Sequence, residues 1–297
     1  MGVSPPLAVA LAGRDLTRVS DLVPAEAEAI LDLAAELKLE PEPLLPAKTL
    51  GLLFSKPSTR TRVSFAVAIA QLGGTCVPLH PDELQLSRGE SLEDTARVLS
   101  SYLDVIAIRC GPQAEVDAWA RAATVPVVNA LTDEEHPCQA LADALTIRER
   151  LGGTDGVRVA WIGDGSNVLA SLAALAPMLG MEIVAASPPG YEAPGVETVR
   201  DPREAAAGAD VLVTDTWISM GQETERERRL ADLEPYRLDA ALLGLAAPEA
   251  IVLHCLPAHP GEEIAADVLY GPRSAVWQEA ENRLHTQKAL LALLLGA

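Results

Sequence analysis

Short apolar runs alternate with Ala- and Leu-rich segments of helical periodicity along most of the 297 residues. The runs cover residues 49–54, 105–110, 125–130, 157–163, 181–187, 211–217 and 251–256. Continuous apolar strands separated by helices are typical of parallel sheets that are covered by helices on both faces. The alternation therefore predicts an α/β protein.

A Gly-rich stretch, LGGTDG at 151–156, interrupts this pattern near the middle of the chain. The segment before it, HPCQALADALTIRERLG, predicts a strong helix, and a final helix is expected at 274–295. We predict two domains, each a parallel sheet flanked by helices and linked by interdomain helices. Residues 1–135 with the C-terminal helix 274–297 form one domain, and residues 136–273 form the other.

The charge balance restricts the partners that such a chain can bind. The chain has 23 Lys and Arg against 42 Asp and Glu, which gives a formal net charge of -19. This balance argues against nucleic acid and anionic membranes, because both require a basic face. The longest apolar stretch, ALLALLLGA, is too short to span a bilayer. Four scattered cysteines without a CxxC pair indicate reduced thiols, so we expect a soluble cytoplasmic protein.

The segment SKPSTRTR (55–62) concentrates cations and hydroxyl groups in this acidic chain. It follows an apolar run, and a helix is expected to begin near Ser58. The first N–H groups of a helix have no acceptor within it, and with the helix dipole they favour an anion. Ser58, Thr59 and Thr61 add hydroxyl donors, and Arg60 adds a planar group suited to phosphate. In the alternative interpretation, Ser58 only caps the helix and the arginines are solvated.

A second polar segment follows the run VPVVNA. His136 and Gln139 lie one helical turn apart, near the expected carboxyl end of a strand, where open α/β sheets bind ligands. His136 there is suited to donate a hydrogen bond to a carbonyl group. As an alternative, His136 is a helix-cap residue without a ligand.

The strand 251–256 ends in His254, Cys255 and Leu256. A thiol at this end of a strand is suited to ligand contact or to proton transfer. Two alternatives are an ordinary buried cysteine and a metal site made by His254, Cys255 and His259. Adjacent strand residues point to opposite faces, which disfavours a shared metal, so we predict none.

Two further strand ends carry candidate residues. Gly163 and Gly165 begin a segment that resembles a dinucleotide fingerprint, but Val168 stands where the third glycine is required. The segment instead predicts a tight turn that presents Asn167. Asp215, at the end of the strand 211–217, is suited to pair with a cationic group, although a loop carboxylate that caps a turn is the alternative.

Together, the motifs KPSTRTR, HPCQ, DTWISMG, HCLPA and ENR occur in an order that resembles the ornithine carbamoyltransferases of the aspartate/ornithine carbamoyltransferase family. The resemblance covers nearly the whole chain. STRTR and HPxQ are shared by carbamoyltransferases of several amines, whereas the DTWISMG and HCLP segments point to ornithine. Rival interpretations are a carbamoyltransferase for another amine, a dinucleotide-dependent oxidoreductase and a non-catalytic ligand sensor.

The resemblance implies a role for each matching residue. Catalysis would depend on Cys255, His136 and Arg109. The residues implied to bind carbamoyl phosphate are Ser58, Thr59, Arg60, Thr61, Gln85, Arg109, His136, Gln139, Cys255, Leu256 and Arg283. The residues implied to bind ornithine are Asn167, Asp215, Ser219 and Met220.

The family resemblance also implies a reaction and a mode of assembly. The carbamoyl group of carbamoyl phosphate would pass to the δ-amine of L-ornithine, giving L-citrulline and phosphate in arginine metabolism. The first predicted domain would bind carbamoyl phosphate and the second would bind ornithine. The family forms trimers or trimer-based assemblies and uses no metal or organic cofactor. In this family Gln85 belongs to a loop that serves a neighbouring subunit's site.

Overall fold

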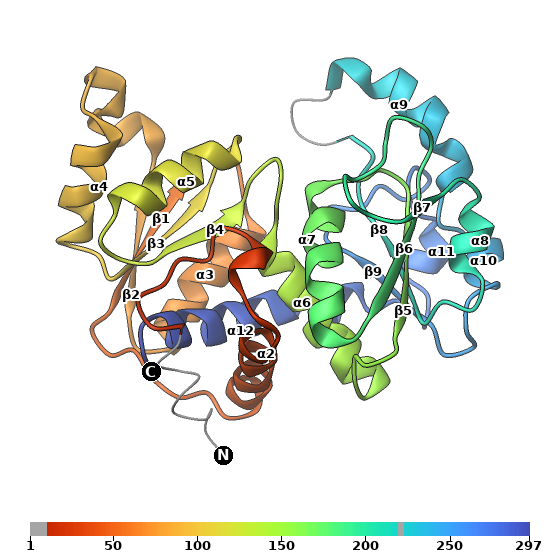
Figure 1. The fold of residues 1–297 in the computed structure, drawn as a ribbon, viewed down its shortest axis with the longest axis horizontal. Helices are drawn as coiled ribbons and strands as arrows, with labels where there is room; N and C mark the ends of the chain where they lie inside the picture. Colours follow the sequence, from red (N-terminus) through yellow and green to blue (C-terminus); the bar gives the residue numbers. More distant parts are fainter. Residues whose placement is uncertain (1–10, 219–222) are drawn as a thin grey trace. The chain divides into compact units, whose positions relative to one another are not determined.

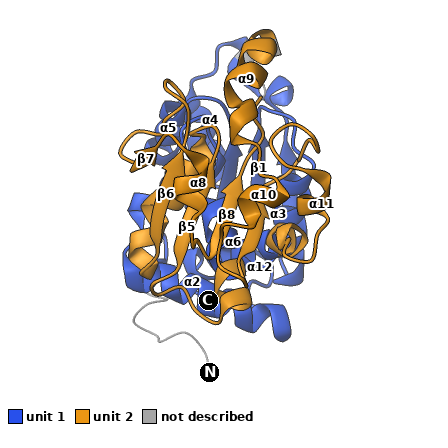
Figure 2. Cartoon of the chain, turned by 90° about the vertical axis from the view of Figure 1, so that its right-hand side faces the viewer, with its two compact units in different colours: residues 1–145, 282–297 blue, residues 146–281 orange. Residues whose placement is uncertain are grey.

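The computed structural model describes residues 11–218 and 223–297, and in them nine strands form two parallel sheets (Figure 1). The chain divides into unit 1, residues 1–145 with 282–297, and unit 2, residues 146–281 (Figure 2). The boundaries fall inside two helices, α6 (Pro137–Leu151) and α12 (Val276–Leu294). The predicted fold class, two parallel sheets flanked by helices and linked by helices, is confirmed.

Unit 1 contains a sheet with the order β2-β1-β3-β4. Its strands are β1 (Thr49–Phe54), β2 (Thr75–Leu79), β3 (Val105–Arg109) and β4 (Val127–Leu131). The central strands β1 and β3 are buried almost throughout, as their apolar sequences predict. In the register of this pair Phe54 lies opposite Arg109, so the two strands end side by side.

Helices cover the sheet of unit 1 and complete its core. Ile106 and Ile108 of β3 pack with Ala96, Val116 and Trp119 of neighbouring helices. The helical elements here are η1 (Val19–Asp21), α2 (Pro24–Leu39), α3 (Arg60–Gln71), η2 (Pro81–Glu83), η3 (Gln85–Arg88), α4 (Leu92–Ser100) and α5 (Gln113–Ala122).

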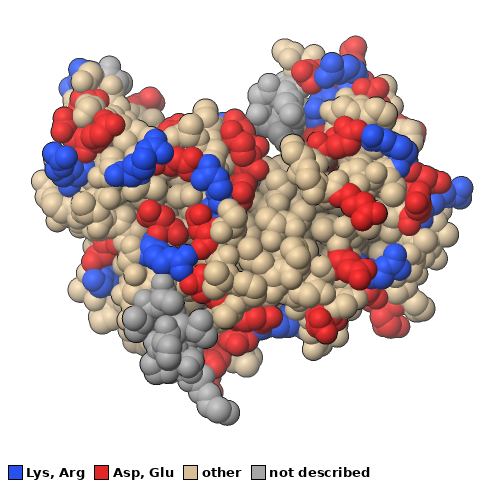
Figure 3. Space-filling model, in the orientation of Figure 1, with Lys and Arg blue, Asp and Glu red and all other residues tan. Residues whose placement is uncertain are grey.

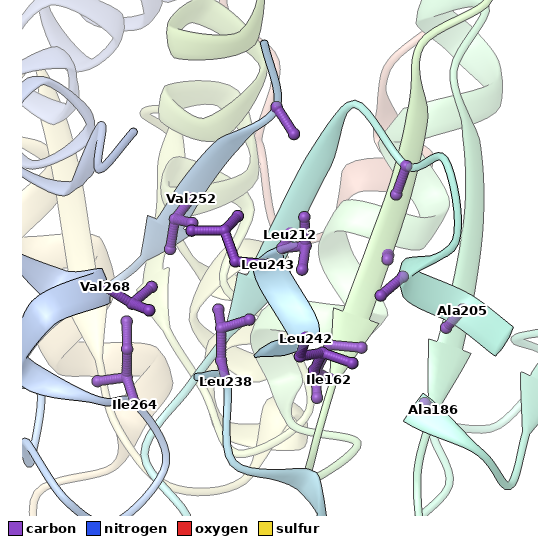
Figure 4. Close-up of a cluster of buried hydrophobic side chains, with 14 of the residues drawn as sticks. Ile162, Ala186, Ala205, Leu212, Leu238, Leu242, Leu243, Val252, Ile264 and Val268 are labelled. Carbon is purple, nitrogen blue, oxygen red and sulfur yellow. The ribbon is translucent and has the colours of Figure 1, made fainter. Parts of the chain in front are cut away.

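Unit 2 contains a sheet with the order β7-β6-β5-β8-β9. Its strands are β5 (Arg158–Ile162), β6 (Glu182–Ala186), β7 (Thr198–Val199), β8 (Val211–Thr214) and β9 (Ile251–His254). Figure 4 shows Ile162, Leu212 and Val252 from three strands packed with Leu242 and Val268. The helical elements are α7 (Asn167–Leu175), η4 (Ala176–Leu179), α8 (Pro202–Ala206), η5 (Glu223–Glu225), α9 (Arg226–Leu233), η6 (Glu234–Tyr236), α10 (Ala240–Leu243) and α11 (Ala266–Leu269).

All seven predicted strands are present, but two of them end two or three residues earlier than expected. The run 211–217 is a strand only to Thr214, and the run 251–256 only to His254. Two strands were not predicted. β2 is an exposed edge strand that contains Pro78, and β7 has only two residues.

The apolar run at the end of the sequence belongs to the core of unit 1. Residues 289–294 form the last turns of α12 and are buried. Lys288 is buried beside them, where its Nζ donates to the carbonyl oxygen of Leu37 at 2.8 Å. Among the described helices, none combines the length and the apolar character that crossing a membrane requires.

Candidate functional site

In unit 1, a polar turn between β1 and α3 exposes the N-terminus of a helix. The helix α3 begins at Arg60, two residues later than predicted. Thr59 occupies the N-cap position and makes no side-chain cap hydrogen bond, so the interpretation that Ser58 caps the helix is wrong. Thr59 and Arg60 are exposed and Ser58 is half-buried. The first N–H groups of α3 and the helix dipole therefore favour an anion at this helix start, and the exposed Arg60 lies beside it.

A second arginine lies against this helix start from the far end of the chain. Arg283 of α12 is buried, and its Nη2 donates to Oγ1 of the buried Thr61 at 2.6 Å. Arg62 is held differently, because its guanidinium stacks on the ring of Phe54 at 5.1 Å. The structure thus brings Thr61 and Arg283 together, as their shared assignment to phosphate requires.

Arg109 is the last residue of β3, next to the start of the polar turn. Its carbonyl oxygen accepts hydrogen bonds from the Ser55 N–H at 2.9 Å and from the Ser55 hydroxyl at 3.2 Å. These bonds connect the carboxyl ends of β1 and β3. Such ends form the ligand-binding edge of open parallel sheets.

His136 precedes α6 and is buried in the same unit. Burial lowers the pKa of His136 well below its usual range, and the nearby Arg283 and Arg109 charges lower it further. The imidazole is therefore neutral at physiological pH, and a neutral imidazole can donate one hydrogen bond to a carbonyl oxygen. The effect of both arginine charges on His136 indicates that Arg109 and Arg283 lie near its imidazole.

Gln139 and Gln85, two further predicted residues of unit 1, have different environments. Gln139 is fully buried on α6, and its Nε2 donates to Oδ1 of Asp143 at 2.8 Å. Gln85 lies in the exposed turn η3, where its Oε1 accepts from Arg88 at 3.3 Å. The contacts of Gln85 therefore connect it to its own loop.

In unit 2, Asp215 is the centre of a hydrogen-bond network just beyond the end of β8. Its Oδ1 accepts from the Cys255 thiol at 3.0 Å and from the Thr216 N–H at 2.7 Å. Its Oδ2 accepts from the Ser166 hydroxyl at 3.0 Å. The network joins the loops that follow β5, β8 and β9, so the alternative of a simple turn-capping carboxylate is wrong.

The turn after β5 leads into a helix, and the space around the turn requires a glycine. Ser166 caps α7 by accepting the Val168 N–H at 3.2 Å, which makes Asn167 the first helical residue. A Cβ on Gly165 would lie 2.4 Å from the backbone nitrogen of Ala193. The close approach of these two loops therefore accounts for Gly165, and a bound dinucleotide is not needed to explain it.

A buried ion pair supports this region and was not predicted. Arg229 of α9 pairs with Asp164 and donates from Nε to the carbonyl oxygen of Trp217 at 2.6 Å. Burial raises the pKa of Asp164 to about 6, the Arg229 charge opposes this rise, and the Asp215 charge adds to it. The pair anchors the segment after β8, while the predicted residues Ser219 and Met220 lie outside the described residues.

From strand alternation we expected the side chains of His254 and Cys255 to point to opposite faces of the sheet. That expectation was wrong. Cys255 lies beyond β9, and donor atoms of Asp215, His254 and Cys255 lie within 4.8 Å of one another. However, His254 is engaged on both ring nitrogens. Its Nδ1 accepts the Leu256 N–H at 2.9 Å, so Nε2 carries the proton and donates to Oε1 of the buried Glu263 at 3.1 Å. The imidazole thereby fixes the backbone after Cys255, where Leu256 has a φ of 60°.

Figure 3 shows the charged side chains on one face of the molecule. On the face in Figure 3, acidic and basic side chains are interspersed over the described residues of both units. The cations that face the α3 helix start are a local group within an acidic protein.

Comparison with known proteins places this architecture in a family. Residues 14–149 match the model of the aspartate/ornithine carbamoyltransferase carbamoyl-P binding domain, and residues 155–294 match that of the Asp/Orn binding domain. Ornithine carbamoyltransferase from Nostoc punctiforme is 52% identical, covering 97% of this chain and 99% of the relative. The relative of that name from Thermosynechococcus vestitus is 54% identical, covering 96% and 97%.

Solved structures give the same result. Ornithine carbamoyltransferase from Pyrococcus furiosus has a TM-score of 0.93 and 46% identity, covering 97% of this chain and 98% of that one. The enzyme of that name from Thermus thermophilus has a TM-score of 0.89 and 46% identity, covering 95% and 98%.

Proposed function

The chain belongs to the aspartate/ornithine carbamoyltransferase family, and from this premise we propose that it transfers a carbamoyl group from carbamoyl phosphate to the δ-amine of L-ornithine. The products are L-citrulline and phosphate, as in arginine biosynthesis. Relatives named for ornithine match nearly the full length of both chains, which supports ornithine over other amines.

One observation carries the assignment of the donor: unit 1 combines an uncapped helix N-terminus with two arginines and a neutral histidine. We assign the phosphate to the α3 turn, with Arg283 and a neighbouring subunit's Gln85. Arg109, His136 and Gln139 hold the carbamoyl group. Residues 1–135 with 274–297 are the carbamoyl phosphate-binding domain in this proposal. The phosphate ligands in the turn are Ser58, Thr59, Arg60 and Thr61.

The acceptor is assigned to residues 136–273. Asn167 and Asp215 bind ornithine together with Ser219 and Met220. The network around Asp215 supports this assignment, because an acidic group is suited to a cationic amino acid. Cys255 and Leu256 contact the carbamoyl group and the amine.

The mechanism follows from the charges that change during transfer. The neutral δ-amine attacks the carbamoyl carbon and forms the new C–N bond, while the carbonyl oxygen becomes an oxyanion. Arg109, His136 and Thr61 donate hydrogen bonds that stabilise this oxyanion. The C–O bond to phosphate then breaks, and phosphate leaves with the electron pair, held by the α3 helix start. Cys255 receives the proton of the amine while its own thiol proton moves to Asp215 Oδ1, which accepts the Cys255 hydrogen bond. The chemistry requires no metal or organic cofactor.

We further propose a cytoplasmic homotrimer or an assembly of trimers. None of the four cysteines forms a disulfide, which supports a reducing compartment. Exposed apolar side chains of the neighbouring elements α3 and β2, Val63, Val67 and Val77, support contact with a second copy of the chain. Light scattering tests the assembly, and Val67→Asp is expected to weaken it.

A steady-state assay tests the reaction itself. Carbamoyl phosphate is supplied with ornithine, N-acetylornithine, N-succinylornithine, putrescine or aspartate in turn. The expected result is citrulline formation, with kcat/KM highest for ornithine. A higher value for another amine would reassign the acceptor, and absence of turnover with intact ornithine binding would favour a ligand sensor.

A further inference from the structure

We propose that Asp143 is a positioning residue that fixes the Gln139 amide with its oxygen toward the donor, so that the protein selects carbamoyl over acyl phosphates. The inference rests on the proposed function, because it concerns how the donor's amino group is recognised. Asp143 itself touches no reacting atom in this proposal and acts through Gln139.

The first step is the orientation of a buried amide. Gln139 and Asp143 are one turn apart on α6, and both are buried. Gln139 Nε2 lies 2.8 Å from Asp143 Oδ1. The amide nitrogen is the donor in this contact, so it is the atom that faces Asp143. The amide oxygen lies on the other branch of the group and is directed away from Asp143.

The second step is the chemistry of the neighbouring groups. Arg109 and Arg283 lie close to His136, one turn before Gln139, and arginines only donate hydrogen bonds. Donors suit the carbonyl oxygen of the carbamoyl group. Its amino group instead requires an acceptor, and the oriented Gln139 supplies one.

Selectivity follows from this matched pair of hydrogen-bonding groups. An acyl phosphate carries a methyl group where carbamoyl phosphate carries NH₂, so it cannot donate to Gln139 Oε1. Sites built to hydrogen-bond a substrate group reject an analogue that lacks it. If the amide could rotate, Gln139 would present NH₂ or oxygen, and the distinction would weaken.

The chain contains a matched control for this pair. On α5, Gln113 Nε2 donates to Oδ1 of Asp117 at 3.2 Å with the same four-residue spacing. There the amide oxygen is used internally, because Gln113 Oε1 accepts from Thr132 Oγ1 at 2.7 Å. Asp117 also forms an ion pair with Arg18. This pair serves structure alone.

Calorimetry on the full chain with two inert donor analogues tests the proposal. Phosphonoacetamide and 2-oxopropylphosphonate differ only in NH₂ against CH₃. The wild type is expected to bind phosphonoacetamide more tightly. Asp143→Leu removes the acceptor of the Gln139 amide, so the affinity ratio should fall about three- to tenfold, the value of one neutral hydrogen bond, with affinity for 2-oxopropylphosphonate unchanged. Asp117→Leu should keep the wild-type ratio.

The outcomes separate this proposal from the proposed function. An unchanged ratio in Asp143→Leu, or an equal loss for both analogues, would overturn the positioning role. Equal wild-type affinity for both analogues, with citrulline formation intact, would overturn it as well. Wild-type protein that binds neither analogue would contradict the proposed function itself.

A measurement on the wild type keeps the test valid if Asp143→Leu does not fold. The ¹⁵N resonance of the Gln139 side chain is followed by NMR with phosphonoacetamide bound. Its NH₂ protons should stay protected from solvent exchange, because Asp143 still accepts them. Rapid exchange in the complex would overturn the proposal.

Discussion

The two polar regions, one in each unit, lie beyond the carboxyl ends of parallel strands, yet they are built from opposite charges. In unit 1, Arg60, Arg109 and Arg283 accompany a helix N-terminus. In unit 2, Asp215 accepts hydrogen bonds from Ser166, Thr216 and Cys255. In the function we propose, the same architecture makes an anion site in one unit and a cation site in the other. The residues at the strand ends, rather than the fold, determine the chemistry.

The largest effect is expected where the central carboxylate of unit 2 is neutralised. Asp215→Asn keeps the shape but removes the charge that pairs with ornithine and accepts from Cys255. We expect kcat/KM for ornithine to fall roughly 10²- to 10³-fold, the usual loss for a buried charged contact. Phosphonoacetamide affinity, which in our proposal depends mainly on the phosphate ligands of unit 1, should stay near the wild-type value. An equal loss of both would show that the two regions are not chemically separate.

The second prediction concerns the buried carboxylate Asp164. Its folded pKa of about 6 lies above the ordinary 3.8, so the folded state binds this proton more tightly than the unfolded state. The resulting stability is complete below about pH 4 and is lost as pH rises through about 6. The free energy of unfolding of wild type minus that of Asp164→Asn should fall by about 3 kcal/mol over this window. Urea unfolding at stepped pH measures it, and parallel curves for the two proteins would refute the assignment.

The third prediction addresses the anion site of unit 1. Arg60→Ala removes a charge-assisted contact to phosphate and should weaken carbamoyl phosphate binding about ten- to a hundredfold. Arg60→Lys should give an intermediate loss, because it keeps the charge without the planar fork. The dissociation constant of phosphonoacetamide reports both. Unchanged affinity in Arg60→Ala would remove Arg60 from the site.

The smallest effect should come from a carboxylate of unit 2 that only caps a helix. Asp239 accepts the Leu242 N–H at 2.8 Å at the start of α10. Asp239→Ala should lower the free energy of unfolding by about 1 kcal/mol, while Asp239→Asn should be nearly neutral. Urea unfolding measures both variants. A drop in ornithine kcat/KM in either variant would show that charge anywhere in unit 2 matters, contrary to the contrast with Asp215.

Much of the fold could be predicted, because buried parallel strands leave continuous apolar runs in the sequence. β2 left no such run, since it lies at the exposed edge and contains Pro78. The early end of β8 has a different cause, because an apolar residue can be buried outside a strand. Trp217 lies beyond the end of β8 and is buried there, and its carbonyl oxygen accepts a hydrogen bond from Arg229.

The candidate residues could be found, but their supporting residues could not. Arg229 reaches Asp164 across 65 residues, and no local pattern predicts that contact. The contact of Glu263 with His254 likewise could not be predicted, because it depends on the path of the chain after Cys255. Asp143 did leave a signal, because it follows Gln139 by four residues on a predicted helix.

The helix α12 begins in unit 2 and delivers Arg283 to unit 1. On the ribosome, residues 146–281 therefore emerge before the residue that contacts Thr61. Unit 2 has its whole sequence available at that moment, whereas unit 1 still lacks part of its core and one cation of its anion site. A stalled nascent chain that stops before Arg283 would thus hold a complete second unit and an unfinished first one.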